Sequence, residues 1–168
     1  MITAIILLSL CIIILALYTY KYEEEMFKIS FKESLDLVGV PIITFKNNNK
    51  KYNFILDTGA SESVIHSKIL DELEYIKIDR ESQLWGMEGN IQTTTYAEIP
   101  LYYWGVEFEE QFQIVDMSSS FIKIKEEFGV NVVGILGSSF FNKYNYILDF
   151  KRLVAYTRKK NKKCKKKE

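Results

Sequence analysis

The sequence contains few of the residues that build metal sites or disulfide frameworks. Its 168 residues include two cysteines and a single histidine, His66. Cys11 lies in an apolar N-terminal run and Cys164 in a lysine-rich tail, so an intramolecular disulfide framework is excluded. There is no Cys-x-x-Cys pair, and a lone histidine is far more often a surface or core residue than a metal ligand. We therefore expect neither a metal nor a cofactor.

Net charge is also absent, because 22 basic and 22 acidic residues cancel. The cancellation hides an uneven distribution. Residues 1–157 hold 14 basic and 21 acidic residues, a net charge of −7, whereas the tail, 158–168, holds eight basic residues and one acidic residue. Such a tail is most often simply solvated. It could also contact anionic lipid, worth about 1 kcal/mol per basic residue near the membrane surface, or nucleic acid, and the pattern is specific for neither.

Charged residues are missing from the N-terminal run as well. Residues 2–20 are almost all apolar and just long enough to cross a bilayer, with Tyr18 and Tyr20 where interfacial aromatic residues belong. No Lys or Arg precedes the run and no small-x-small pair closes it, which favours an uncleaved anchor over a cleaved signal peptide. We predict a single-pass transmembrane helix over 1–20 and a charged stalk over 21–35. The flanking charges are too mixed to predict which side of the membrane the rest of the chain occupies.

Beyond the stalk, short β-rich segments alternate with turn signals. The chain is 48% hydrophobic and 14% aromatic, enough for a packed core. Many short strands with a few small helices indicate an all-β, closed, barrel-like domain. Strands are expected at 38–45, 52–56, 63–66, 99–104, 106–115, 130–137, 146–150 and 153–156, a hairpin at 83–96, and short helices at 67–73, 119–128 and 138–143.

Three local signals predict finer detail. Pro41 suggests that its strand lies at a sheet edge, because proline cannot donate a backbone hydrogen bond. Ser118 is a fair N-cap for the helix that follows it, and Ser138 or Ser139 for the next one.

The most distinctive stretch is 54–61. Three apolar residues run directly into Asp57, which is followed by Thr58 and Gly59. The apolar run is typical of the end of a buried strand, and Asp-Thr-Gly of a sharp turn in which glycine tolerates unusual backbone angles. A carboxylate held at the tip of a strand is a candidate for acid–base chemistry. The alternative interpretation is a loop that begins with Asp and has no chemistry.

Two later stretches extend this pattern. The hairpin at 83–96 carries Gly86 and Gly89 near its tip, together with exposed apolar residues, although most such hairpins are ordinary β-turns. The segment 130–137 is a second buried strand that ends on a glycine, Gly137.

In this order, the three pieces resemble the retroviral-type (retropepsin-like) aspartic proteases. Leu56 to Ser61 matches the family's apolar-Asp-Thr-Gly-Ala-Ser turn, Trp85 to Asn90 looks like its flap, and Gly134 to Gly137 matches its later apolar-apolar-Gly strand. The resemblance covers about 36–157. The N-terminal run lies outside it, the insert 117–128 is longer than a minimal viral domain needs, and Asp-Thr-Gly occurs once.

The resemblance implies an aspartic endopeptidase that acts on a peptide or protein substrate. Asp57 would be the catalytic acid/base, Thr58 would grip its counterpart in a partner chain, and Gly59 would let the substrate backbone approach. The implied flap residues are Trp85, Gly86, Met87, Glu88 and Gly89. The implied supporting residues of the active site are Ala60, Ser61, Ile135, Leu136 and Gly137.

The single Asp-Thr-Gly bears on the oligomeric state. Aspartic-protease chemistry needs two carboxylates that share a proton. One such acid per chain therefore requires a homodimer, with an Asp57/Asp57 dyad on the two-fold axis. The alternative is a non-catalytic binding or dimerisation module with the same fold, which would have no need of an acid at this turn. A protein that functions only through its basic tail, on lipid or nucleic acid, is a third possibility supported by the lysines alone.

Overall fold

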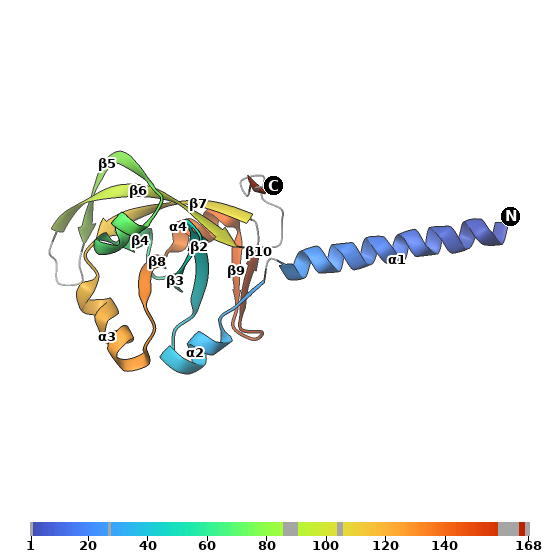
Figure 1. Cartoon of the computed structure of the whole chain (residues 1–168), viewed down its shortest axis with the longest axis horizontal. Helices are drawn as coiled ribbons and strands as arrows, with labels where there is room; N and C mark the ends of the chain where they lie inside the picture. Colours follow the sequence, from blue (N-terminus) through green and yellow to red (C-terminus); the bar gives the residue numbers. More distant parts are fainter. Residues whose placement is uncertain (1, 27, 86–90, 104–105, 158–164, 167–168) are drawn as a thin grey trace.

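Six strands join edge to edge in a closed ring (Figure 1). The computed structural model describes the backbone of residues 2–26, 28–85, 91–103, 106–157 and 165–166, and the side chains of 6–18, 28–81, 94–103 and 106–157. In spatial order the ring comprises β7 (Val106–Val115), β4 (Ser63–His66), β8 (Val132–Leu136), β3 (Lys50–Leu56), β2 (Ile42–Asn47) and β6 (Ile91–Tyr103). Pairing of β6 with β7 closes the ring, so the predicted mostly-β, closed barrel is confirmed.

Strand direction within the ring decides which ends of the strands meet. β3 runs parallel to β8, with Ile55 opposite Ile135, and β4 runs parallel to β7. Parallel neighbours end at the same edge of a sheet, so the C-terminal ends of β3 and β8 lie together. The two stretches that the sequence analysis singled out, around Asp57 and Gly137, follow these two ends.

β6 differs from the prediction because it is one long strand. Its first part pairs with β5 (Ile76–Trp85) and its second part with β7, where separate strands had been expected on either side of Glu98. Pro41 also differs: it lies just before β2, and β2 sits between β3 and β6 rather than at an edge. The Pro41 carbonyl accepts a hydrogen bond from the backbone N–H of Leu56 (2.9 Å). Because Pro41 lies outside β2, the N–H that it lacks removes no hydrogen bond from the strand ladder.

Aromatic side chains fill the centre of the barrel. The ring of Phe45 lies 5.5 Å from that of Phe108, 6.2 Å from Phe54 and 6.1 Å from Phe140, measured between centroids. All four side chains are buried. Edge-to-face pairs of this kind add about 0.5–1.5 kcal/mol each beyond the apolar area they bury. The core thus holds β2, β3 and β7 against the helix that contains Phe140.

A second, three-stranded sheet ties the two ends of the domain together. β1 (Ile29–Ser30) pairs with β10 (Val154–Thr157), which pairs with β9 (Tyr146–Asp149). Ile29 and Phe31 are buried, and α2 (Lys32–Val38) follows them. The folded body therefore begins inside the predicted stalk, 21–35, and earlier than residue 36. In the sequence, the charged residues of 21–35 obscured the apolar side chains of Ile29 and Phe31, which pack into the core.

The three predicted short helices are present as η1 (Ser67–Glu72), α3 (Ser118–Phe128) and α4 (Ser138–Tyr144). The predicted caps are wrong. Ser118 is the first helical residue of α3, and its N–H donates to the Asp116 carboxylate (2.9 Å). Gly137 holds the N-cap position of α4, so Ser138 and Ser139 lie in its first turn. Their N–H groups are thereby free to bond outside the helix.

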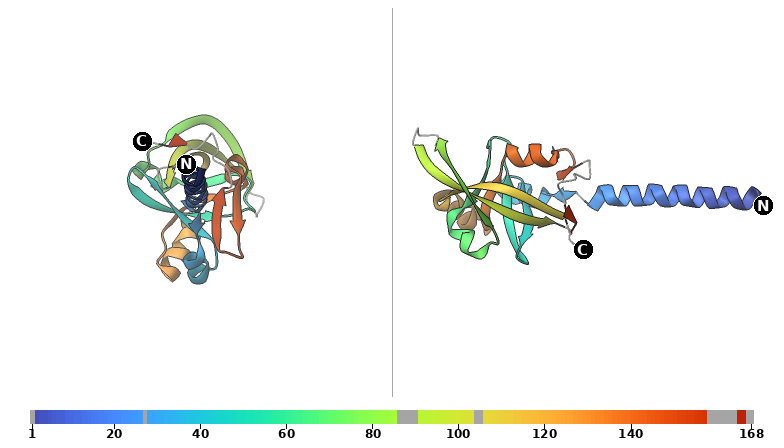
Figure 2. Two further views of the ribbon diagram at one scale, coloured as in Figure 1. Left: turned by 90° about the vertical axis from the view of Figure 1, so that its right-hand side faces the viewer. Right: turned by 90° about the horizontal axis from the view of Figure 1, so that it is seen from above.

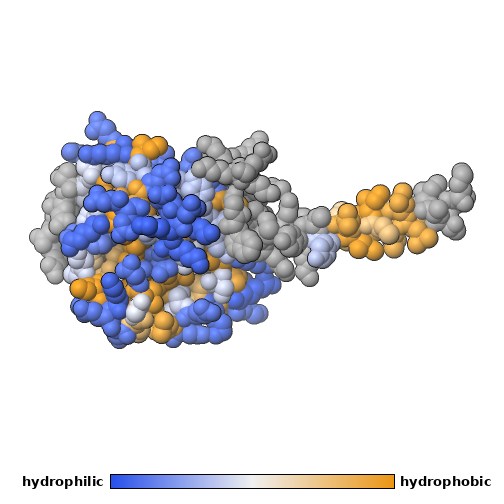
Figure 3. Space-filling view, in the orientation of Figure 1, coloured by the Kyte–Doolittle hydropathy of each residue, from blue (hydrophilic) through white to orange (hydrophobic). Residues whose placement is uncertain are grey.

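At the N-terminus, α1 (Ile2–Met26) projects from the barrel as one long helix, and Figure 2 shows the β5–β6 hairpin extending on the opposite side of the body. Exposed apolar side chains from Ile6 to Tyr18 surround this helix (Figure 3). Among the residues with described side chains, no helix is both long and apolar enough to cross a membrane. The anchor over 1–20 stays a prediction.

Candidate active site

The Asp57 turn begins where the barrel locks the end of β3. Leu56 is buried, and the backbone N–H of Asp57 donates to the carbonyl of Leu136 on β8 (3.0 Å). Gly137 follows directly after β8, so the stretches that contain Gly59 and Gly137 meet at one edge of the sheet. Sequence analysis predicted both of these strand ends, and the structure brings them together.

The Asp57 carboxylate is held by its own turn. Its Oδ1 atom accepts a hydrogen bond from the backbone N–H of Gly59 (2.8 Å), and the Asp57 carbonyl accepts one from Ala60 (3.3 Å). Asp57 is half-buried, whereas Thr58 and Gly59 are exposed. A Cβ atom on residue 59 would lie 3.1 Å from Oδ1, so glycine keeps the approach to this oxygen open. The carboxylate is fixed in direction and remains accessible.

The N-terminus of α4 holds the turn from behind. The backbone N–H groups of Ser138 and Ser139 donate to the carbonyls of Ala60 (2.8 Å) and Ser61 (3.1 Å). The Ser138 hydroxyl donates to the carbonyl of Thr58 (2.9 Å). Two carbonyls of the turn therefore accept from backbone N–H groups of α4's first turn that have no partner within the helix, and a third accepts from a side-chain hydroxyl. Ala60 and Ser61, the implied supporting residues, contact α4 through their backbone carbonyls.

Gly137 permits this contact because it has no side chain. A Cβ atom there would lie 2.5 Å from the Glu62 carbonyl oxygen and 2.9 Å from that of Ala60. Its φ angle of −92° is one that other residues also adopt, so close approach is the reason for glycine at this position. The neighbouring supporting residues differ in burial: Leu136 is fully buried and Ile135 is half-buried.

Glu62 joins the turn to the β5–β6 hairpin. Its Oε2 atom accepts hydrogen bonds from the Tyr96 hydroxyl (2.5 Å) on β6 and from the Gln113 side-chain amide (2.8 Å) on β7. Its Oε1 atom lies 3.4 Å from Arg80 on β5. The carboxylate thus bridges the segment that follows Asp57 and both strands of the hairpin. Sequence analysis did not identify Glu62, because a lone acid after the motif carries no local signal.

The predicted flap belongs to this hairpin. Trp85 is the last residue of β5 and pairs with Ile91 at the start of β6. Gly86, Met87, Glu88 and Gly89 lie outside the described residues.

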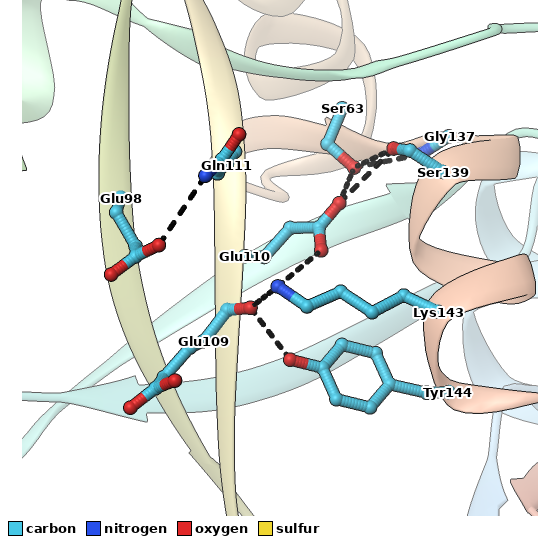
Figure 4. Close-up of polar contacts among 9 residues, drawn as sticks. All are labelled: Ser63, Glu98, Glu109, Glu110, Gln111, Gly137, Ser139, Lys143 and Tyr144. Atoms are coloured by element: carbon cyan, nitrogen blue, oxygen red, sulfur yellow. Dashed lines mark hydrogen bonds and ion pairs between the residues drawn. The ribbon is translucent and has the colours of Figure 1, made fainter. Parts of the chain in front are cut away.

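A buried acid under the turn was also missed by sequence analysis. Glu110 on β7 is 2% exposed, and its Oε1 atom accepts hydrogen bonds from the hydroxyls of Ser63 (2.8 Å) and Ser139 (3.1 Å) (Figure 4). Burial raises the pKa of Glu110 above its ordinary value, while its bond to Ser63, the nearby charge of Lys143 and its bond to Ser139 act in the opposite direction. The available signal was an acid at an inward position of an alternating strand.

The Asp-Thr-Gly turn supplies one accessible carboxylate, that of Asp57. Within the part of the chain that the structure describes, no three His, Cys, Asp or Glu residues lie together in a way that could hold a metal ion. His66 has a structural contact: its Nδ1 atom accepts a hydrogen bond from the backbone N–H of Met117 (3.1 Å). The chemistry that this site can perform is proton transfer by Asp57.

Comparison with known proteins points to the same region. A family model described as retroviral aspartyl protease matches residues 39–148, about two thirds of the chain. The match includes the Asp57 turn, the β5–β6 hairpin and the strand that ends on Gly137. No curated protein matches the chain significantly.

Proposed function

Because this chain belongs to the retroviral aspartyl protease family, we propose that it is an aspartic endopeptidase whose active site forms between two copies of the chain. The observation that carries the proposal is the Asp57 carboxylate, oriented by Gly59 and left accessible at the tip of β3. Each chain contributes one such acid. A homodimer would bring two of them together on its two-fold axis, where they would form the catalytic dyad.

Two adjacent carboxylates can divide the chemistry of peptide hydrolysis. Like charges about 3 Å apart cannot both ionise, so the pair holds one proton. The ionised Asp57 takes a proton from water as the water oxygen attacks the peptide carbonyl carbon, and the protonated Asp57 gives its proton to the carbonyl oxygen. As the C–N bond of the tetrahedral intermediate breaks, the Asp57 that took a proton from water gives it to the departing nitrogen, and the other Asp57 takes a proton back from a hydroxyl of the intermediate as the C=O bond re-forms. The products are a carboxylic acid and an amine.

The remaining residues of the turn have supporting roles in this proposal. Thr58 is exposed beside Asp57, which suits contact with a partner chain, and Gly59 leaves room for a substrate backbone. The β5–β6 hairpin, tied to the turn through Glu62, would cover a bound peptide. The substrate of the enzyme would be a peptide or protein, bound between the dyad and this hairpin.

We also propose that α1 anchors the enzyme in a membrane as a single-pass helix. Its described side chains, from Ile6 to Tyr18, are exposed and apolar apart from Ser9, whose hydroxyl donates to the Ile6 carbonyl of the same helix (2.8 Å). A helix that is apolar all round requires burial in protein or lipid. The basic tail, 158–168, would add contacts with anionic headgroups if it reaches the membrane surface.

The proposal is tested with the full-length chain in detergent micelles and a library of peptides. Wild type is expected to cleave some of them, and Asp57→Asn none. Asp71→Asn is the matched control, because Asp71 is an exposed acid on η1, outside the site. Cleavage by a folded Asp57→Asn variant at a rate near that of wild type would refute the assignment. Failure of wild type to cleave any peptide, while still forming a dimer, would favour the non-catalytic module.

A further inference from the structure

Glu110 occupies a position where the barrel elsewhere places apolar residues. The inward-facing residues of β7 alternate along the strand, and its neighbours in this row, Phe108 and Phe112, are at most 1% exposed. Glu110 is 2% exposed. Transfer of a carboxylate from water into such a site is unfavourable unless hydrogen bonds and charges compensate. The acid therefore needs an explanation beyond packing.

The carboxylate is bonded from two different elements. Its Oε1 atom accepts hydrogen bonds from Ser63 at the start of β4 and from Ser139 in the first turn of α4 (Figure 4). Its Oε2 atom lies 3.8 Å from the ammonium group of Lys143, one turn further along α4. Lys143 also donates to the Glu109 carbonyl, which in addition accepts from the Tyr144 hydroxyl (2.6 Å). Glu110 thus stands where β4, β7 and α4 meet.

An ionised carboxylate sets the direction of both hydroxyl groups. A carboxylate only accepts hydrogen bonds, so the single proton of each serine must point toward Glu110. The lone pairs of the Ser63 oxygen are then available, and one of them accepts the backbone N–H of Gly137 (3.1 Å). Ser63 is fully buried, so no water can replace either partner. The acid determines which way this chain of hydrogen bonds runs.

The start of α4 contacts the Asp57 turn through Gly137, Ser138 and Ser139. The backbone of Gly137 lies against the carbonyls of Ala60 and Glu62, and Ser138 and Ser139 bond to those of Thr58, Ala60 and Ser61. We propose that Glu110 is a positioning residue for Asp57: by bonding Ser63 and Ser139 together it fixes the start of α4, and α4 fixes the turn that carries the acid. The expected effect of Glu110 on catalysis rests on the proposed function, whereas its expected effect on the position of the turn does not.

A purely structural role would lower stability and leave the turn and kcat unchanged. Removal of one member of a buried ion pair is destabilising when the other member stays buried, but the Lys143 side chain is 30% exposed and can turn toward water. Glu110→Leu should therefore be less stable than wild type and still fold, and it removes the acceptor that directs both hydroxyls. Glu110→Gln keeps a carbonyl oxygen that can accept from both serines, and it is the conservative variant that should restore the positioning. Glu107→Gln is the matched control on the same strand, because Glu107 bonds to Tyr102 on β6 and lies away from α4.

The experiment uses the full-length chain in micelles and measures site-resolved amide hydrogen exchange together with peptide cleavage. In Glu110→Leu the amides of Ser138 and Ser139 should exchange at least about tenfold faster than in wild type, as expected when a directing hydrogen bond is lost. The amide of Ile147 on β9 should be unaffected. The kcat should fall by up to about 100-fold, the cost of misplacing a reacting group by about 1 Å, and KM should change much less. Glu110→Gln should recover most of both losses, and Glu107→Gln should resemble wild type.

Unchanged exchange of Ser138 and Ser139 in Glu110→Leu would overturn the inference, and so would faster exchange with an unchanged kcat. If Glu110→Leu fails to fold, Ser139→Ala removes one of the two donors and is judged by the exchange of the Ser138 amide in the same way. If wild type cleaves no peptide, the proposed function fails, and the exchange rates alone still decide whether Glu110 positions the turn.

Discussion

Gly137 and Glu62 approach each other so closely that a Cβ atom on residue 137 would lie 2.5 Å from the Glu62 carbonyl oxygen. The two residues belong to the stretches on either side of the active-site edge, the start of α4 and the segment after Asp57. Their contact makes the position of the turn sensitive to any added volume at residue 137.

Gly137→Ala is therefore expected to lower the free energy of unfolding by about 1–3 kcal/mol, the usual cost of overpacking. Its kcat should fall as well, because the turn must move away from α4. Urea denaturation and cleavage assays measure the two effects. Gly39→Ala is the control: Gly39 has a positive φ of 79° and open space around its Cβ direction, so it tests backbone strain without a clash. A Gly137→Ala variant as stable and active as wild type would contradict the close packing.

Glu110 predicts how stability depends on pH. Burial raises its pKa in the folded chain above the ordinary value of 4.5. At a pH between 4.5 and the folded-state pKa, the folded chain therefore binds more protons than the unfolded chain. The contribution of Glu110 to the free energy of unfolding is then most favourable below pH 4.5 and is lost as the pH rises through its folded-state pKa. Glu110→Gln has no such titration. Its free energy of unfolding relative to wild type should rise from acidic to neutral pH in urea titrations, and a difference independent of pH would refute this.

A shared dyad predicts that an inactive chain inhibits an active one. A dimer of one wild-type and one Asp57→Asn chain has a single carboxylate and should not cleave. With about a tenfold excess of Asp57→Asn and random pairing, the activity per wild-type chain should fall about tenfold. The same excess of albumin is the control. Activity that is unaffected by the inactive chain, after incubation long enough for chains to exchange, would show that one chain suffices.

The membrane proposal predicts how the protein is extracted. A spanning helix resists salt and dissolves only in detergent, whereas a tail bound through its charge is released at about 1 M salt, where electrostatic attraction is screened within about 3 Å. Deletion of residues 2–20 should release the protein from membranes, and deletion of 158–168 should not. Release of the intact chain by salt alone, or a mature chain that lacks the first 20 residues, would refute the anchor.

The sequence predicted the parts of the site whose signals are local. The apolar run before Asp57 and the run before Gly137 each identify a buried strand and the turn that ends it. Parallel pairing of β3 and β8 then places both at one edge. Local signals also located α3 and α4, which end next to Gly129 and Asn145.

The sequence did not predict features that depend on distant neighbours. Glu110 stands at an inward position of an alternating strand, and only the positions of Ser63 and Ser139 explain its burial. The segment with Ile29 and Phe31 reads as a charged stalk until β10 is available to pair with it. The cap of α3 was misplaced by one residue: Met117 holds the N-cap position, and the Asp116 carboxylate before it accepts the N–H of Ser118.

The pairing of β1 with β10 also has a consequence for biosynthesis. Ile29 lies opposite Ala155, so the first strand of the domain is made well before the strand with which it pairs. Long-range contacts of this kind form late, since the entropy of closing the loop must be overcome before they stabilise anything. Until then Ile29 and Phe31 have no partner strand. The fold can be completed only after synthesis has passed Val154, and nascent chains that stop before Val154 should remain sensitive to added protease.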